Sequence, residues 1–421
     1  MIIKELVKSI IGKEKVSAAK GQVLHWLFSA KLKKAGKLKI EGKRLTLYRK
    51  ISAGDYHVFR GYYDIHYMSS DQSRFLVHRL PLNALTNKET KIETGYYDLK
   101  SDRYVNVSSS SAWCWQQGSR LRWHPLYADE ILFNDVLPES NGYCTRIVNI
   151  KTGRDTAIIP YPMYDIANDF SYGISIDFGR LQRMRHGYGY NYYPDYSEGE
   201  LQPSDDGLWI VDLSTNHAEL LFSVRQLAET AGLEQEKECY LNHISISPDH
   251  RHFMFFLISC TAGIAGWETV LFVSDKEGKE LSILERKDRV SHYCWLDNQT
   301  LMVTCRRKDN TEYYCTFDIS DKSKSVLQIR NLDVDGHPNV IGSEEIITDT
   351  YPGDFSLQKI RIFKLSDQHA DTELSIYHDS RLRGEQRCDL HPSVEASGEF
   401  AAIDTTYEDG KRCVLVFKVK G

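Results

Sequence analysis

Histidines recur along this chain at one kind of place, a short segment that precedes a polar turn and an apolar strand. Six histidines occur in this context, and they are His66, His124, His243, His292, His337 and His391. If these segments line one central channel, the imidazoles converge in space although they lie far apart in the sequence. Convergent imidazoles with a carboxylate or an amide can bind a divalent metal. A single histidine at the start of a strand can instead be structural and hold a turn by a hydrogen bond.

A second group of chemically capable residues lies in one glycine-punctuated segment, residues 180–193. Its members are Arg180, Arg183, Arg185, Tyr188, Tyr190, Tyr192 and Tyr193. Arginine pairs bidentately with carboxylates, and tyrosine offers a stacking face and a phenolic proton. The segment is therefore suited to hold an acidic sugar, and we expect it on the same face as the histidines. The alternative is a rigid loop whose arginines pair with the nearby acids Asp177, Asp195 and Asp205.

The elements that must position these residues are short strands, which begin at about residue 45. A polar turn followed by an apolar strand occurs seven times, at 70–77, 129–133, 168–174, 248–255, 297–303, 343–347 and 397–402. Successive turns mostly lie roughly 40 to 60 residues apart, which is the spacing of four-stranded propeller blades. The last unit has too few strands, so residues 44–51 are expected to complete it. The sequence thus predicts an all-β, seven-bladed β-propeller over residues 45–421.

Residues 1–40 differ from the rest and are predicted to form a short helical, lysine-rich arm. Residues 1–37 contain nine lysines, two glutamates and no arginine, with apolar residues spaced for helix faces. A cationic amphipathic segment can lie on an anionic membrane surface. The alternative is an arm that packs on the propeller by its apolar face.

Composition excludes several classes of protein. The formal net charge of −5 argues against a nucleic-acid binder. Nine cysteines without a CxxC pair indicate a reducing compartment and no disulfide framework. No apolar run is long enough to span a bilayer, and residues 23–30 do not match a secretory signal. We therefore expect a cytoplasmic protein, with association at the inner membrane through the arm as an open alternative.

The last predicted blade carries a resemblance to a known family. Residues 385–392, with the turn and strand at 397–400, are similar to the terminal blade of oligogalacturonate lyases, seven-bladed propellers of the TolB-like superfamily. In that family three residues of the terminal blade bind Mn²⁺, namely a Gln, a His three residues after it and a second His two residues later. A His from an earlier blade also binds the ion. The resemblance implies Gln386 and His391 as ligands, with Asp389 in place of a His and His292 as the earlier-blade ligand. We add His337 to this set, and Zn²⁺ is the alternative ion if Cys388 contributes.

The family resemblance also implies a reaction, β-elimination from a uronate. This reaction needs a group that neutralises the carboxylate, a base for the C5 proton and an acid for the leaving oxygen. The candidates are the metal, Arg180 or Arg183 for the first role, His124 or His243 for the second, and Tyr188 or Tyr190 for the third. Arg183, Arg185 and Tyr190 are candidate substrate-binding residues. Arg122 joins them, from residues 116–124, which resemble the second-blade segment of the superfamily.

The leading hypothesis is a lyase-like propeller that acts on an acidic oligo- or polysaccharide with help from a metal or an arginine. Its rival is a non-catalytic propeller of cell-surface polysaccharide biosynthesis or export, peripheral to the inner membrane. A protein-interaction propeller without a small-molecule site is the third possibility. No P-loop, nucleophile elbow or dinucleotide fingerprint is present in the sequence.

Overall fold

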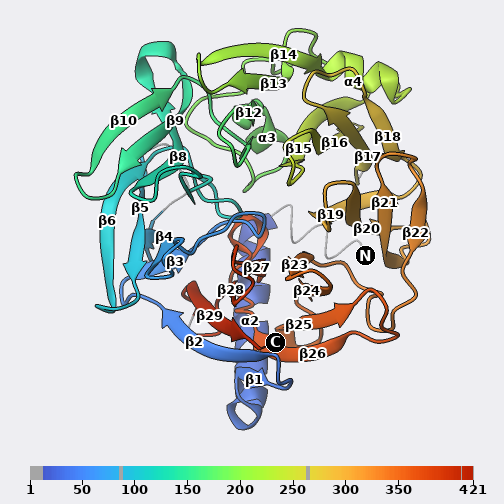
Figure 1. Cartoon of the computed structure of the whole chain (residues 1–421). Coiled ribbons are helices and arrows are strands. Elements are labelled where there is room, and N and C mark those ends of the chain that lie inside the picture. Colours follow the sequence, from blue (N-terminus) through green and yellow to red (C-terminus); the bar gives the residue numbers. More distant parts are fainter. Residues whose placement is uncertain (1–12, 85–88, 262–265, 409, 421) are drawn as a thin grey trace.

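The computed structural model is a ring of seven antiparallel sheets around a central channel (Figure 1). The structure describes residues 13–84, 89–261, 266–408 and 410–420. In blades one to five, four consecutive strands follow one another across the sheet. The first strand of each blade lies nearest to the channel (Figure 1). The prediction of an all-β, seven-bladed propeller is confirmed.

The strands of the first four blades follow the sequence without interruption. Blade one contains β3 (Tyr56–Phe59), β4 (Arg74–Pro81), β5 (Ile92–Asp98) and β6 (Arg103–Ser110). Blade two contains β7 (Arg122–Trp123), β8 (Glu130–Leu137), β9 (Gly142–Asn149) and β10 (Arg154–Ile159). Blade three contains β11 (Asp165–Ile166), β12 (Tyr172–Ser175), β13 (Gly207–Asp212) and β14 (His217–Ser223). Blade four contains β15 (Glu238–Ile246), β16 (His252–Cys260), β17 (Glu268–Asp275) and β18 (Ser282–Glu285).

Blade five is built from consecutive strands, whereas blades six and seven also take up strands from the beginning of the chain. Blade five contains β19 (Arg289–Trp295), β20 (Thr300–Arg306), β21 (Glu312–Asp318) and β22 (Lys324–Val326). Blade six contains β23 (Asn339–Ile341), β24 (Glu345–Asp349), β25 (Leu357–Lys364), β26 (Asp371–Tyr377) and, at its outer edge, β1 (Leu38–Ile40). Blade seven contains β27 (Ser393–Val394), β28 (Phe400–Thr405), β29 (Cys413–Val419) and β2 (Leu45–Ile51). The helices are α2 (Lys13–Ala35), α3 (Phe178–Met184), α4 (Val224–Thr230), η1 (Pro138–Ser140), η2 (Asp354–Ser356) and η3 (Gly384–Gln386).

The ring is closed by β2, which forms the outer strand of blade seven. It pairs antiparallel with β29, from Leu45 opposite Val419 to Ile51 opposite Val414. The pairing gives the unpaired edge of β29 a partner, which removes a template for aggregation. The expectation that residues 44–51 complete the last blade is therefore confirmed.

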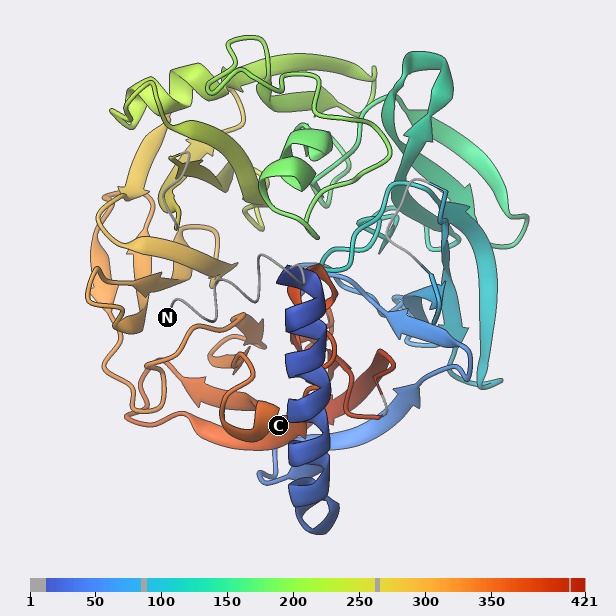
Figure 2. The same cartoon turned by 180° about the vertical axis from the view of Figure 1, so that it is seen from behind.

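Helix α2 lies across one face of the ring, from near the channel to beyond the rim (Figure 2). Its His25 Nδ1 lies 3.1 Å from the Tyr377 hydroxyl, and Phe28 packs edge-on against Phe355. Gly21 permits close approach, because a Cβ there would lie 2.8 Å from the Ser380 carbonyl oxygen. Of the predicted arm, residues 1–12 lie outside the described part of the chain. No described helix is long and apolar enough to cross a membrane.

Three buried histidines make the stability of the fold dependent on pH. Burial lowers the pKa of His57, His78 and His378 to about 4. The unfolded chain, with histidine pKa values near about 6.5, therefore binds more protons between these limits, and stability falls as the pH decreases from about 6.5 to about 4. We expect each histidine to contribute at most about 1.4 kcal/mol per pH unit in this window, measured by urea unfolding at a series of pH values.

The Nε2 atom of His78 offers a matched test of this pH dependence. It lies 2.9 Å from the Ser119 hydroxyl and accepts the Ser119 N–H at 3.1 Å, so protonation would remove its lone pair. His78→Gln should reduce the slope of stability against pH, because the unfolded variant has one site fewer for protons. An unchanged slope would show that His78 does not contribute.

Candidate metal centre

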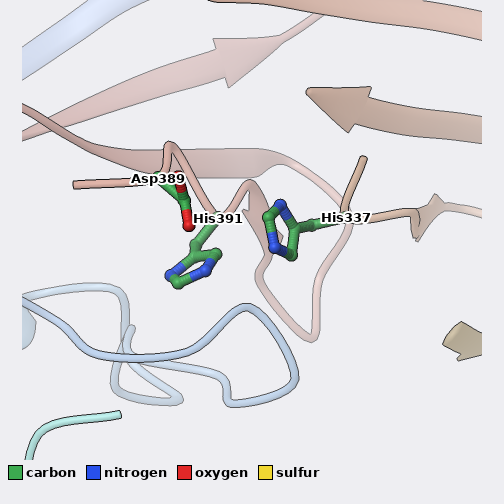
Figure 3. A group of neighbouring side chains, drawn as sticks. All are labelled: His337, Asp389 and His391. Carbon is green, nitrogen blue, oxygen red and sulfur yellow. The ribbon is translucent and has the colours of Figure 1, made fainter. Parts of the chain in front are cut away.

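The strongest cluster of chemically capable side chains lies at one end of the channel. It consists of His337, which precedes β23, and of Asp389 and His391, which precede β27 (Figure 3). One ligand atom from each residue lies within 4.8 Å of the other two. All three side chains are buried. The segments that enter two neighbouring blades therefore bring two imidazoles and a carboxylate together, as the metal hypothesis requires.

The imidazoles of this cluster are held in fixed orientations through their Nδ1 atoms. His337 Nδ1 lies 2.8 and 3.0 Å from the two carboxylate oxygens of Asp349, and His391 Nδ1 donates to the Gly61 carbonyl at 3.0 Å. The Nε2 atoms of both rings are buried and have no hydrogen-bond partner among the described residues. An imidazole oriented through Nδ1 with a free Nε2 is the usual arrangement of a metal-binding histidine.

A third imidazole, that of His292, lies beside this pair. Its ring centroid is 4.0 Å from that of His337, which in turn is 4.4 Å from that of His391. His292 Nδ1 lies 2.9 Å from a carboxylate oxygen of Asp335, and its Nε2 lies 3.5 Å from the Tyr351 hydroxyl. The site thus contains three imidazoles, each with Nδ1 bound to an oxygen atom.

The protonation of these histidines follows from burial and from their neighbours. Burial and the nearby His337 lower the pKa of His292 and, well below the ordinary value, that of His391. Burial opposes the charged form of His337 as well, but the Asp349 carboxylate outweighs it and raises the pKa. At neutral pH, His292 and His391 are therefore neutral and can offer a lone pair to a metal or a proton.

Asp389 supplies the negative charge of the cluster and is shared with Arg387. The Arg387 Nε and Nη2 atoms donate to the two carboxylate oxygens at 2.7 and 2.6 Å. Burial opposes ionisation, but this guanidinium outweighs it and holds the pKa of Asp389 well below its usual range. Each carboxylate oxygen has a second lone pair, so Asp389 can bind a metal ion while it remains paired with Arg387.

The donor set fits a divalent first-row metal. Two imidazole nitrogens and a carboxylate oxygen are typical ligands of such ions, and the two orphaned Nε2 atoms have no other described partner. Gln386 lies in η3, where its carbonyl accepts from Arg412, and no side-chain contact joins it to the described cluster. The Cys388 thiol is also outside the cluster and lies 3.9 Å from the Asp389 carbonyl oxygen.

Two tyrosines separate the cluster from the other end of the channel. The Tyr62 ring is 4.7 Å from that of His391, and the Tyr63 ring is 5.2 Å from that of His337. Tyr63 also lines a cavity of about 590 Å³ at the opposite mouth. The hydroxyl of Tyr62 lies 3.2 Å from His243 Nδ1, which places His243 at the edge of the cluster.

Two residues that sequence reasoning assigned to the site lie at the opposite mouth. Arg122 and His124 both line the 590 Å³ cavity. Arg122 pairs with Asp165 at 2.9 Å. His124 Nδ1 accepts the Leu126 N–H, and its ring packs against Phe170 at 4.3 Å. These contacts give both residues structural roles at a distance from the histidine cluster.

The segment 180–193 divides into a structural part and a part that lies beside the histidine cluster. Arg180 is buried and donates to the Cys239 carbonyl, while Arg183 Nε pairs with Asp195 at 2.8 Å. Tyr190 is buried and stacks on Phe178 at 4.3 Å. For these residues the structure agrees with the alternative of a rigid loop.

Arg185 and Tyr188 lie instead beside the histidine cluster. Arg185 is stacked over the Tyr188 ring at 4.5 Å, and Tyr188 is 5.9 Å from the His243 ring. Arg185 and Arg289 lie 5.2 and 4.7 Å from the Trp267 ring. Among the described residues, neither guanidinium has a carboxylate partner. Two arginines without a counter-ion beside the cluster favour an anionic ligand.

Sequence reasoning missed the residues that orient the imidazoles and the aromatic residues around them. These residues are Tyr62, Asp335, Asp349, Tyr351, Trp267, Arg289 and Arg387. The sequence contains one local signal that could have identified two of them. Asp335 lies two residues before His337, and Arg387 lies two residues before Asp389. Asp349 ends β24, and only the pairing of β23 with β24 brings it to His337.

Comparisons with known proteins agree with the fold. No protein-family model and no curated protein matches the chain. An oligogalacturonate lyase from Vibrio parahaemolyticus superposes over 91% of this chain and 99% of its own, with a TM-score of 0.60 and 11% identity. The tricorn protease superposes over 87% of this chain and 34% of its own, with a TM-score of 0.53 and 10% identity. At these identities the likeness shows a shared propeller fold and no activity.

Proposed function

We propose that this propeller binds a divalent metal, Mn²⁺ or Zn²⁺, and acts as a lyase on an acidic oligo- or polysaccharide. The observation that carries the proposal is the convergence of three oriented imidazoles with Asp389, beside two arginines that have no carboxylate partner among the described residues. The fold shared with an oligogalacturonate lyase is consistent with it. The ligands would be His337, His391 and Asp389.

The metal, when bound, would polarise the substrate carboxylate and make the neighbouring C–H more acidic. The residues of the chain would bind and orient the sugar. Arg185 and Arg289 would hold carboxylates, because they are charged and free of acidic partners among the described residues. Trp267, which contacts both arginines and is 42% exposed, would stack on a sugar ring.

The proton transfers of a β-elimination would fall to His292 and Tyr351. His292 is neutral at pH 7, and Asp335 fixes its Nδ1, so its Nε2 can accept the C5 proton. The electron pair of that C–H bond forms the C4–C5 double bond as the C4–O bond breaks. Burial raises the pKa of Tyr351 well above its usual value, so its phenol stays protonated and can donate to the leaving oxygen. His243, whose ring is 6.0 Å from His292, is the second candidate base.

The test is the absorbance of the unsaturated uronate on a panel of acidic oligosaccharides, with and without Mn²⁺ or Zn²⁺. We expect metal-dependent product formation that His292→Gln reduces by about 10²-fold or more, while metal binding persists. His217→Gln, a change at an exposed histidine of β14, serves as the matched control. Turnover that survives complete metal removal, or full activity of His292→Gln, would contradict the proposal.

One observation favours a second function, that of a non-catalytic glycan-binding propeller in cell-surface polysaccharide biosynthesis or export. Arg387 contacts both oxygens of Asp389, so the carboxylate already has a cationic partner without a metal. In this case, calorimetry would detect binding of an acidic oligosaccharide that depends on Arg185 but not on metal. No unsaturated product would form.

A further inference from the structure

Helix α2 carries an apolar stripe on the face that points away from the propeller. Its exposed side chains include Val23, Trp26 and Leu27, which are 59%, 71% and 45% exposed. Ala19 and Ala30 are exposed one turn before and after them. Positions 19, 23, 26, 27 and 30 share one side of a helix, because they repeat at intervals of three and four residues. The stripe is therefore continuous along about three turns.

The stripe is not needed to hold α2 on the ring. The contacts with the propeller come from the opposite face, through Gly21, His25, Phe28 and the buried Leu32. The helix thus has apolar residues on both sides, one packed and one exposed. A large indole and two aliphatic side chains remain in solvent, and grouped exposure of this kind marks an interaction surface.

The charge of α2 indicates what covers the stripe. The helix has one acidic residue, Glu14, and six lysines, namely Lys13, Lys15, Lys20, Lys31, Lys33 and Lys34. Two copies of the chain joined through this helix would bring these like charges together. An anionic lipid surface would attract them, and it would also accept the tryptophan at the level of its headgroups.

The position of α2 relates this surface to the channel. The helix contacts Phe355 and Tyr377, and Gly21 lies against residues 380–383, just before η3 and the Arg387–Asp389 pair. Since α2 lies across one face of the ring (Figure 2), these contacts place the helix on the same face as the histidine cluster. A surface that covered the stripe would face the end of the channel that holds the cluster.

We propose that α2 docks this propeller on an anionic lipid bilayer, with Val23, Trp26 and Leu27 at the boundary between headgroups and acyl chains. The helix lies in the plane of the membrane surface and does not cross it. Docking turns the face with the histidine cluster toward the bilayer. This inference is independent of the proposed lyase chemistry.

The test is co-sedimentation of the full chain with vesicles of phosphatidylcholine alone or mixed with phosphatidylglycerol. We expect at least about tenfold stronger partitioning to the anionic vesicles, weakened by salt. The double variant Trp26→Ser/Leu27→Gln should lose at least about tenfold of this partitioning while its melting temperature stays unchanged. Leu126→Gln is the matched control, because Leu126 is 55% exposed at the opposite mouth of the channel.

Several outcomes would overturn the docking proposal. They are equal partitioning to neutral and anionic vesicles, no partitioning at low salt, and anionic partitioning of the double variant equal to that of the parent chain. Size-exclusion chromatography can give one more outcome that would overturn the proposal. A dimer that is lost in the double variant would make a second copy of the chain the occupant of the stripe.

Discussion

Replacing His337 with glutamine will weaken binding of the divalent metal by more than about 100-fold, because even residues that only orient metal ligands contribute 10- to 100-fold. His337 Nε2 is buried, has no hydrogen-bond partner in the described part of the chain and lies within reach of the ligand atoms of Asp389 and His391. Glutamine can still bond to Asp349 but does not place a nitrogen lone pair at the position of Nε2. Calorimetric titration with Mn²⁺ and with Zn²⁺ measures the change.

The matched control for His337→Gln is His217→Gln, which changes an exposed histidine of blade three. This control should bind metal like the parent chain. A melting temperature for each variant separates loss of the ligand from loss of the fold. If a well-folded His337→Gln protein binds metal with the affinity of the parent chain, His337 is not a ligand.

Replacing Asp404 with alanine will destabilise the protein by about 3 to 5 kcal/mol, because it leaves the buried charge of Arg60 without its partner. Arg60 follows β3 in blade one, is 0% exposed and donates from Nε to Asp404 Oδ1 in β28 at 3.2 Å. The pair joins the first blade to the last. Urea unfolding, followed by far-ultraviolet circular dichroism, measures the free energy of unfolding.

Loss of Asp404 should also disturb the candidate metal site. Arg60 Nη2 donates to the His391 carbonyl at 2.7 Å, and His391 has a φ of 46°, an unfavourable backbone conformation for a residue other than glycine. We therefore expect weaker metal binding in Asp404→Ala even under conditions where it is folded. The control is Lys50→Ala at the partly exposed Lys50–Glu408 pair, which should cost at most about 1 kcal/mol. Equal destabilisation by the two changes would show that the buried pair has no special role in ring closure.

The fold could be predicted from the sequence because a propeller repeats one local pattern. Each polar turn is followed by an apolar strand whose burial in the structure is almost continuous, as in Phe253–Ile258 of β16. The repeat gave the number of blades, and the missing strand of the last blade pointed to residues 44–51. Both conclusions depend on local periodicity and on the need to pair sheet edges, which a single sequence contains.

The site could be predicted only in part, because the repeat does not fix the depth of each histidine in the channel. His124 lies at the opposite mouth, whereas His337 and His391 meet at the other end. The side chains of the arginines in residues 180–193 lie in different surroundings for a similar reason. Arg180 lies in the first turn of α3 and faces the interior, whereas Arg185 follows the helix and lies beside the cluster. Tertiary packing determines which side of a helix faces the interior and how far along the channel a strand residue lies. The spacing of residue types in the sequence does not contain this information.

The most direct test of the metal site is a crystal soaked in Mn²⁺ and measured for anomalous scattering at the manganese absorption edge. The account predicts one strong peak in the channel, about 2 Å from His337 Nε2, His391 Nε2 and a carboxylate oxygen of Asp389. The Arg387–Asp389 contacts would be retained or lengthened. Crystals with no peak in the channel, or with manganese only at exposed carboxylates of the rim, would contradict the account.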